Sequence, residues 1–425
     1  MNYKLIYRIL FLVLILKSVT TTAQDSSLVE NTDQKSYRLY TEKKWTELIK
    51  FGKSAIKKGD DYFYLRMRIG IAYYEKKNFS LAENEFKKAL SFNSTDELAL
   101  EYLYYCYVFN GKTEDARFLS KTFSNELLQK IGIDKQSKVD FVIIEGGTKI
   151  TDSTSYYDAS KKKESNYFDP ATYFHVGLNH SIKNRVSLFH AITYYKQQNF
   201  VNKINQTQYY LKASIPIKNN WLIMPALHFV HIKTTSVFTS TTVPPIGPFP
   251  GPPPKQQTIT SISKSNYIVG SIAAQKNINK FTLGIGTTVS NMNNVTQYIH
   301  SGYAHYSIFG NSKLMLGCTD YIHTTTNYST INNSLAPFIY IQPLKKLSLK
   351  ASYLINSGNN IIEENGYIVN NSADLTKSRW GILANFSLTK HLSVYGLYQL
   401  ENKQENVQLF NYKYNVIIGG IKITP

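Results

Sequence analysis

The chain has 425 residues and a formal net charge of +19, from 48 Lys and Arg against 29 Asp and Glu. So large a basic surplus suits nucleic-acid binding, but no DNA- or RNA-reading motif accompanies it, so no nucleic-acid partner is expected. The lysines are spread over turns and loops, which favours a surface facing anionic lipid or polysaccharide. The two cysteines, Cys106 and Cys318, lie far apart and exclude a disulfide framework.

Residues 1–23 have the three parts of a secretory signal peptide. Lys4 and Arg8 supply positive charge, residues 9–16 are apolar throughout, and Ala23 ends a small-residue cleavage site. The apolar run is about 8 residues, whereas a spanning helix needs roughly 20. A cleaved export signal is therefore favoured over a retained anchor.

Residues 29–130 change to a helical periodicity, with a pattern that recurs about every 34 residues. Small residues at its packing positions let paired helices approach, and aromatic residues fill the gaps between pairs. The expected packing positions are Trp45, Leu48, Ala55, Gly70, Tyr73, Phe79, Ala82, Phe86, Ala89, Tyr107, Ala116 and Phe123.

The central copy of this pattern resembles the tetratricopeptide repeat, although Arg66 stands at the usual Trp position and Ser94 at the usual Pro. The resemblance implies a groove that binds a periplasmic partner protein. The alternative is a short scaffold that only packs against a neighbouring domain. Neither reading predicts an active site here.

Residues 138–425 alternate between apolar and polar side chains in strand after strand. In residues 347–355, for example, Leu347, Leu349 and Ala351 oppose Ser348 and Lys350. Such segments run for about 9–12 residues, the length with which a tilted strand crosses a bilayer. The pattern predicts an antiparallel transmembrane β-barrel of about 14 strands, with about 12 or 16 as alternatives.

The connections between these strands alternate in length. Short turns fall near residues 277–280, 310–313, 343–346 and 389–391, and most of the connections between them are longer. Outer-membrane barrels have short periplasmic turns and longer outside loops. This predicts an outer-membrane location, in contact with outer-membrane lipid, with the helices and the C-terminus in the periplasm. A soluble β-sandwich is the alternative, and it does not require this asymmetry.

The polar side chains at alternate positions along the strands are expected to line the lumen. Its basic and hydroxyl-rich side chains favour a conduit for anionic or sugar-like solutes, and an ordinary packed polar interior is the alternative. The candidate lumen-lining residues are His175, Asn179, Tyr210, Lys212, Tyr303, His305, Lys350, Asn385, Tyr395, Asn411 and Lys413.

No catalytic, cofactor or metal site is predicted. A hydrolase needs a serine, a histidine and an orienting group on neighbouring strands. Histidines and serines are available, but none sits in a diagnostic motif. The pairs His228/His231 and His300/His305 lack a third ligand at a suitable spacing.

Residues 243–254 form a proline-rich run, which cannot join a sheet and is expected to be a stiff external loop. With helical repeats before a barrel, the layout resembles YaiO-type outer-membrane β-barrel proteins and, more distantly, exopolysaccharide exporters. The resemblance implies envelope transport, with polysaccharide as one candidate cargo. An outer-membrane enzyme acting on lipid or glycan, and a plugged barrel that only anchors the helices, are the alternatives.

Overall fold

The computed structural model describes residues 30–133, 139–151, 155–158, 163–166, 170–182, 186–198, 202–217, 221–242, 255–326, 331–355, 361–370, 374–404 and 411–425. The predicted signal peptide and the proline-rich run at 243–254 lie outside these residues.

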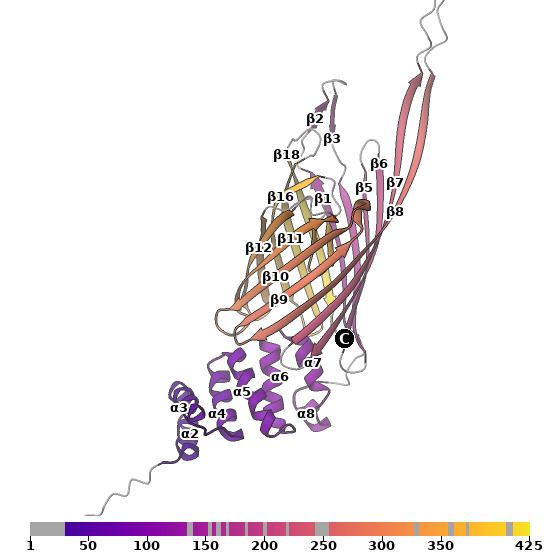
Figure 1. Cartoon of the computed structure of the whole chain (residues 1–425). Coiled ribbons are helices and arrows are strands. Elements are labelled where there is room, and N and C mark those ends of the chain that lie inside the picture. Colours follow the sequence, from indigo (N-terminus) through magenta and orange to yellow (C-terminus); the bar gives the residue numbers. More distant parts are fainter. Residues whose placement is uncertain are drawn as a thin grey trace, which may run out of the picture.

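Seven helices make up the N-terminal part of the described chain (Figure 1). None of them is both long enough and apolar enough to cross a bilayer. Side-chain caps begin several of them, for instance Asn31, which forms a capping box with Gln34. The helices are α2 (Thr32–Thr41), α3 (Trp45–Lys57), α4 (Phe63–Glu75), α5 (Phe79–Phe92), α6 (Glu97–Phe109), α7 (Thr113–Ser120) and α8 (Asn125–Lys130).

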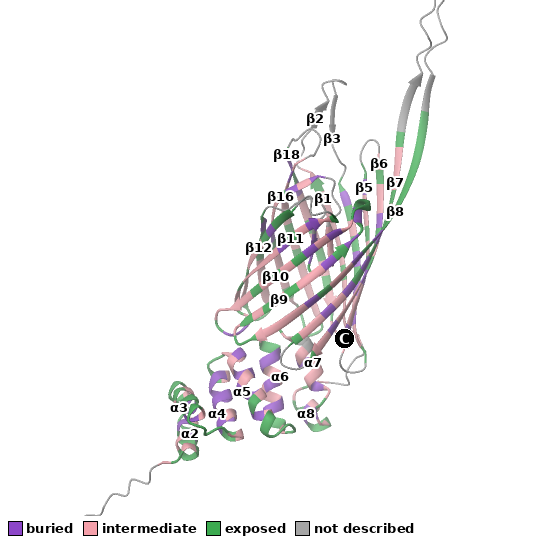
Figure 2. Cartoon of the chain, in the orientation of Figure 1, coloured by how far each residue is buried: buried purple, intermediate pink, exposed green. Residues whose placement is uncertain are grey.

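Each of α2 to α6 packs on the helix that follows it, and buried side chains gather in α4, α5 and α6 (Figure 2). Helices α4 and α5 approach closely at Gly70, where a Cβ would lie 2.7 Å from Cε1 of Phe86 on α5. Ten of the twelve predicted packing positions are buried, and Trp45 and Phe79 are half-buried. Small residues therefore set the helix spacing here.

Fourteen antiparallel strands close into a barrel, with β1 paired to β18, so the predicted fold class is confirmed. Two short hairpins, β2–β3 and β14–β15, stand apart from this sheet. The barrel strands are β1 (Val139–Thr151), β4 (Ala171–Ile182), β5 (Val186–Gln198), β6 (Asn202–Ile217), β7 (Trp221–Thr242), β8 (Lys255–Ile278), β9 (Phe281–Ser290), β10 (Gln297–Ser307), β11 (Leu314–Thr325), β12 (Ile331–Leu344), β13 (Leu347–Ile355), β16 (Leu375–Ser387), β17 (Leu392–Gln404) and β18 (Asn411–Ile423).

The outer face of the barrel is apolar. Alternate side chains along the strands point outwards, and many of the large exposed ones are aliphatic. Single exposed aliphatic residues are normal on any protein, whereas a contiguous apolar surface needs a partner phase. Members of this outer face include Ile144, Val176, Ile192, Leu227, Ile272, Ile285, Leu316, Ile339, Ile382, Ile417 and Ile421.

The helices lie against one mouth of the barrel, where the C-terminus also lies (Figure 1). Two turns and the start of β1 hold them there. The bonds are Ser80 N to Gly310 O (2.9 Å), Asn311 Nδ2 to Lys77 O (3.0 Å), Ser312 Oγ to Phe109 O (3.0 Å), Asn84 Nδ2 to Asn279 Oδ1 (2.8 Å) and the ion pair of Arg117 with Asp140 (2.8 Å).

Candidate functional site

A short hairpin lies inside the barrel. Its strands, β14 (Ile361–Glu363) and β15 (Ile368–Asn370), come between β13 and β16 in sequence but pair only with each other. Three consecutive residues, Glu364, Asn365 and Gly366, have positive φ and turn the chain back. Asn followed by Gly is a strong hairpin signal because both residues tolerate this conformation.

The turn of this lumen hairpin is hydrogen-bonded to side chains of three wall strands. Tyr210 on β6 and Ser271 on β8 donate their hydroxyls to the carbonyl oxygen of Asn365, at 3.3 and 2.5 Å. His228 on β7 lies 2.7 Å through Nδ1 from the carbonyl oxygen of Gly366. These bonds satisfy backbone groups that would otherwise be unpaired in the turn.

Tyr367 extends the attachment to the neighbouring strands β4 and β5. Its hydroxyl lies 2.9 Å from Nε2 of His175, whose Nδ1 is 2.8 Å from the hydroxyl of Thr193. The Tyr367 ring also meets Phe189 and Tyr210 with centroids 5.8 and 5.0 Å apart. Edge-to-face ring contacts and hydrogen bonding together fix this side chain.

The base of the hairpin is held by charge and by apolar packing. Glu363 forms an ion pair with Arg379 on β16, and both side chains are largely buried. Ile362 is 2 % exposed and belongs to an apolar cluster inside the barrel. The other buried members of that cluster are Val230, Tyr267, Val269, Met292, Ile299 and Tyr321. The lumen hairpin thus touches strands around most of the wall.

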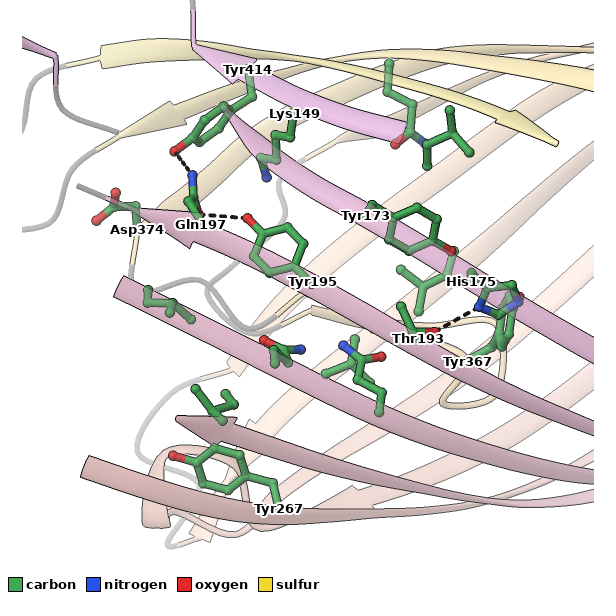
Figure 3. Close-up of a pocket in the computed structure, with 18 of the residues that line it drawn as sticks. Lys149, Tyr173, His175, Thr193, Tyr195, Gln197, Tyr267, Tyr367, Asp374 and Tyr414 are labelled. Atoms are coloured by element: carbon green, nitrogen blue, oxygen red, sulfur yellow. Dashed lines mark hydrogen bonds between the residues drawn. The ribbon is translucent and has the colours of Figure 1, made fainter. Parts of the chain in front are cut away.

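The lumen hairpin divides the interior into two cavities. The outer cavity, of about 860 Å³, lies on the loop side, and Lys149, Tyr195, Gln197 and Tyr414 are among its lining residues (Figure 3). The inner cavity, of about 790 Å³, lies on the helix side and is lined by residues such as Lys212 and Lys350. Tyr367 contributes to both cavities.

Most of the predicted lumen residues are on the inner wall. His175 lines the outer cavity, while Asn179, Tyr210, Lys212, Tyr303, His305, Lys350 and Tyr395 line the inner one. Asn385 lines neither cavity. On β16 it lies at alternate positions with Arg379 and Leu383, which line the inner cavity, so it is on the same inward face of the strand.

The prediction for Asn411 and Lys413 is wrong. Both side chains are exposed, whereas Tyr412 and Tyr414 are 4 % exposed and line the outer cavity. The tyrosines resemble a lipid-facing row in sequence because they are aromatic and alternate with polar residues. In the barrel their hydroxyls meet lumen partners, Asp374 and Gln197 respectively.

The surroundings of the described histidines bear on the hydrolase alternative. His175 is 1 % exposed, and its ring nitrogens lie against Thr193 and Tyr367. No histidine of the described chain hydrogen-bonds a serine hydroxyl. The same part of the chain holds no cluster of three or more potential metal ligands.

The geometry defines a closed β-barrel whose lumen is crossed by a hairpin of its own chain. No family model and no curated protein matches the sequence. Solved structures to which the chain is similar include a Pseudomonas aeruginosa FadL homologue (10 % identity, TM-score 0.40, 67 % of this chain and 90 % of that chain) and the Ralstonia pickettii toluene transporter TbuX (8 %, 0.44, 68 % and 90 %). The Acinetobacter baumannii outer membrane protein Omp33 is also similar (10 %, 0.35, 68 % and 100 %).

Proposed function

We propose that this protein is an outer-membrane barrel that conducts a polar solute, and that the lumen hairpin controls passage. The observation that carries the proposal is the combination of an apolar outer face with a hollow interior that is lined by many polar side chains among apolar and aromatic ones. A soluble barrel would expose such a face to water at a cost of about 25 cal/mol for each Å². A bilayer removes that cost, and closure of the sheet leaves no unpaired strand edge in lipid.

The helices and the C-terminus belong in the periplasm under this proposal. The four short turns after β8, β10, β12 and β16 lie at the same end as the helices, and the long β7–β8 ribbon lies at the other (Figure 1). Short periplasmic turns and long outside loops are the usual arrangement of outer-membrane barrels. The orientation follows from that asymmetry.

The transported species is an anionic or sugar-like solute, or a polymer built from sugars. Polar side chains line both cavities, and each cavity has the volume of a small-molecule site, roughly 300–1,000 Å³. A chain-like polymer needs a continuous channel, so its export requires the lumen hairpin to move away from its docked position in the lumen. A barrel plugged permanently by the hairpin, serving only as an anchor, is the second candidate function.

Ion conductance in planar bilayers separates these functions. The full-length protein is compared with a variant in which residues 361–370 are replaced by a flexible Gly-Ser segment of equal length. We expect a small current from the native protein and a several-fold larger current from the variant. Heat-modifiable migration in gels checks that the barrel of each protein is folded. If both proteins are folded and neither carries current, the transport function is overturned and the structural-anchor function remains.

The helical segment is proposed to be a tetratricopeptide-like module that docks a periplasmic partner protein. Supporting this, Tyr37 on α2 and Tyr64 on α4 are exposed beside Arg68, whose guanidinium lies 5.3 and 6.0 Å from the two ring centroids. A photo-crosslinking residue at position 64 should capture one discrete partner in intact cells, and the same residue at exposed Lys88 should not. Equal labelling from both positions would contradict the docking role.

A further inference from the structure

We infer that the outer cavity is a binding site for an uncharged saccharide. The inference rests on the proposed function and narrows it, because it chooses the neutral sugar over the anion as the species recognised on the loop side of the hairpin. Three features of the cavity wall carry it: paired charges, a tyrosine-rich lining and amide groups directed at the cavity.

The charged side chains of the outer cavity are bonded to partners within the wall. Lys149 Nζ lies 2.7 Å from a carboxylate oxygen of Glu401, and Arg379 is paired with Glu363. The Asp374 carboxylate accepts a hydrogen bond from the hydroxyl of Tyr412. An ionic solute would have to break one of these buried pairs, at a cost of several kcal/mol before any gain. An uncharged solute does not disturb them.

Tyrosines and amides supply the remaining lining. Tyr195 donates its hydroxyl to Gln197 Oε1 at 2.7 Å, and Gln197 donates through Nε2 to the hydroxyl of Tyr414 at 3.3 Å (Figure 3). Within the described part of the chain, no side-chain hydrogen bond engages Gln206 or Gln399, although both line the cavity. Aromatic rings offer faces to the CH surface of a sugar, and free amides exchange hydrogen bonds with its hydroxyls.

The inner cavity has a different chemistry. Lys212 Nζ lies 5.9 Å from the ring centroid of Phe189, and Lys350 Nζ lies 4.8 Å from that of Phe338. Cationic groups beside phenylalanines suit an anion or an aromatic solute rather than a neutral sugar. Saccharide recognition is therefore assigned to the outer cavity only, where Tyr367 of the lumen hairpin forms part of the wall.

Two pairs of side chains offer a matched test. Tyr195 in the outer cavity and Tyr303 in the inner cavity each donate a hydroxyl to a glutamine, Gln197 at 2.7 Å and Gln275 at 3.0 Å. Tyr195→Phe and Tyr303→Phe each remove one such hydroxyl, and Gln197→Leu removes the amide. Binding of maltotriose, a neutral trisaccharide, and of trigalacturonate, a charged one, is measured by titration calorimetry on the full chain in detergent micelles.

Maltotriose should bind to the native protein. Its Kd should rise about five- to tenfold in Tyr195→Phe and in Gln197→Leu, because each variant loses one or two hydrogen bonds. The Kd should not change in Tyr303→Phe. Tighter binding of trigalacturonate than of maltotriose overturns the inference. If neither sugar binds to a protein that conducts ions, the saccharide site is also overturned, while the proposed conducting function is retained. Site-specific maltotriose binding without conductance upholds the saccharide site and removes the conduit.

Discussion

The carboxylate of Glu363 accepts two hydrogen bonds from Nη2 of Arg379, at 2.5 and 2.6 Å, and so joins the lumen hairpin to the barrel wall. Both side chains are about nine-tenths buried. Removing one partner of such a pair leaves the other charge unpaired in a poorly hydrated place, which costs about 3–5 kcal/mol. The docked position of the hairpin depends on this contact more than on any single hydrogen bond of its turn.

Glu363→Gln should therefore loosen the lumen hairpin and raise the single-channel conductance several-fold in planar bilayers. The matched control is Glu364→Gln, one residue further along the same hairpin, because that carboxylate is exposed. Equal conductance of the native protein and Glu363→Gln would show that the ion pair does not hold the hairpin in place.

A disulfide across the turn should lock the hairpin. A Cβ on Gly366 would lie 3.7 Å from Cβ of Ser271 on β8, within the range of about 3.5–4.5 Å found in disulfides. In the double variant Gly366→Cys/Ser271→Cys, conductance should fall under oxidation and recover on reduction. Ser271→Cys alone, which retains native Cys106 and Cys318, should show no redox response.

Glu83 should make the helical segment sensitive to acid. Burial acts to raise the pKa of this carboxyl, but the ammonium groups of Lys112 and Lys87, each 2.7 Å away, outweigh burial and hold the pKa below its ordinary value. Because the folded pKa is lowered, the ionised carboxylate stabilises the fold above its ordinary pKa, and this contribution is lost as pH falls through the folded pKa.

Glu83→Gln should lower the helical stability at neutral pH by about 1.5–3 kcal/mol, the value of hydrogen bonds to a charged group, and should flatten the acid-side dependence. Helical circular dichroism during urea unfolding, at several pH values in micelles, measures both effects. Exposed Glu47 on α3 supplies the control Glu47→Gln, which should match the native protein. A native-like pH profile in Glu83→Gln would contradict the assignment.

Gly70→Ala should destabilise the helices because the new methyl group would lie 2.7–3.0 Å from three atoms of the Phe86 ring. Overpacking of this kind costs about 1–3 kcal/mol, seen as an earlier loss of helical signal on heating. Phe86→Leu removes the clash, so Gly70→Ala should add little destabilisation in that background. Additive losses in the double variant would rule out the steric cause.

Much of the architecture follows from local pattern. Alternation along segments such as β13 and the contrast between short turns and long connections predicted a barrel of about fourteen strands, which the structure has. The 34-residue spacing predicted Gly70 and Phe86 as packing positions, and in the structure these two residues are in tight contact. Both signals arise within a few neighbouring residues, where backbone geometry fixes which side chains share a face.

The interior of the barrel was less accessible to sequence reasoning. Asn365-Gly366 marks a turn, but nothing local says that the hairpin around it folds inwards, because its partners Arg379, His228 and His175 lie on separate strands. For the same reason Tyr412 and Tyr414 could not be placed on the lumen side. Aromatic residues suit lipid and lumen equally, and the choice between them depends on distant hydroxyl and carboxylate partners.

The two strands that carry the turn's partners His228 and Ser271 also reach furthest from the barrel (Figure 1). Beyond Ser236 on β7 and Ser261 on β8, the two strands pair only with each other, which gives a ribbon of about 20 Å at about 3.3 Å for each residue. A force applied to the far end of this ribbon would be carried along β7 and β8 to His228 and Ser271, whose side chains are hydrogen-bonded to the turn of the lumen hairpin. The ribbon is thus mechanically coupled to the lumen hairpin inside the barrel.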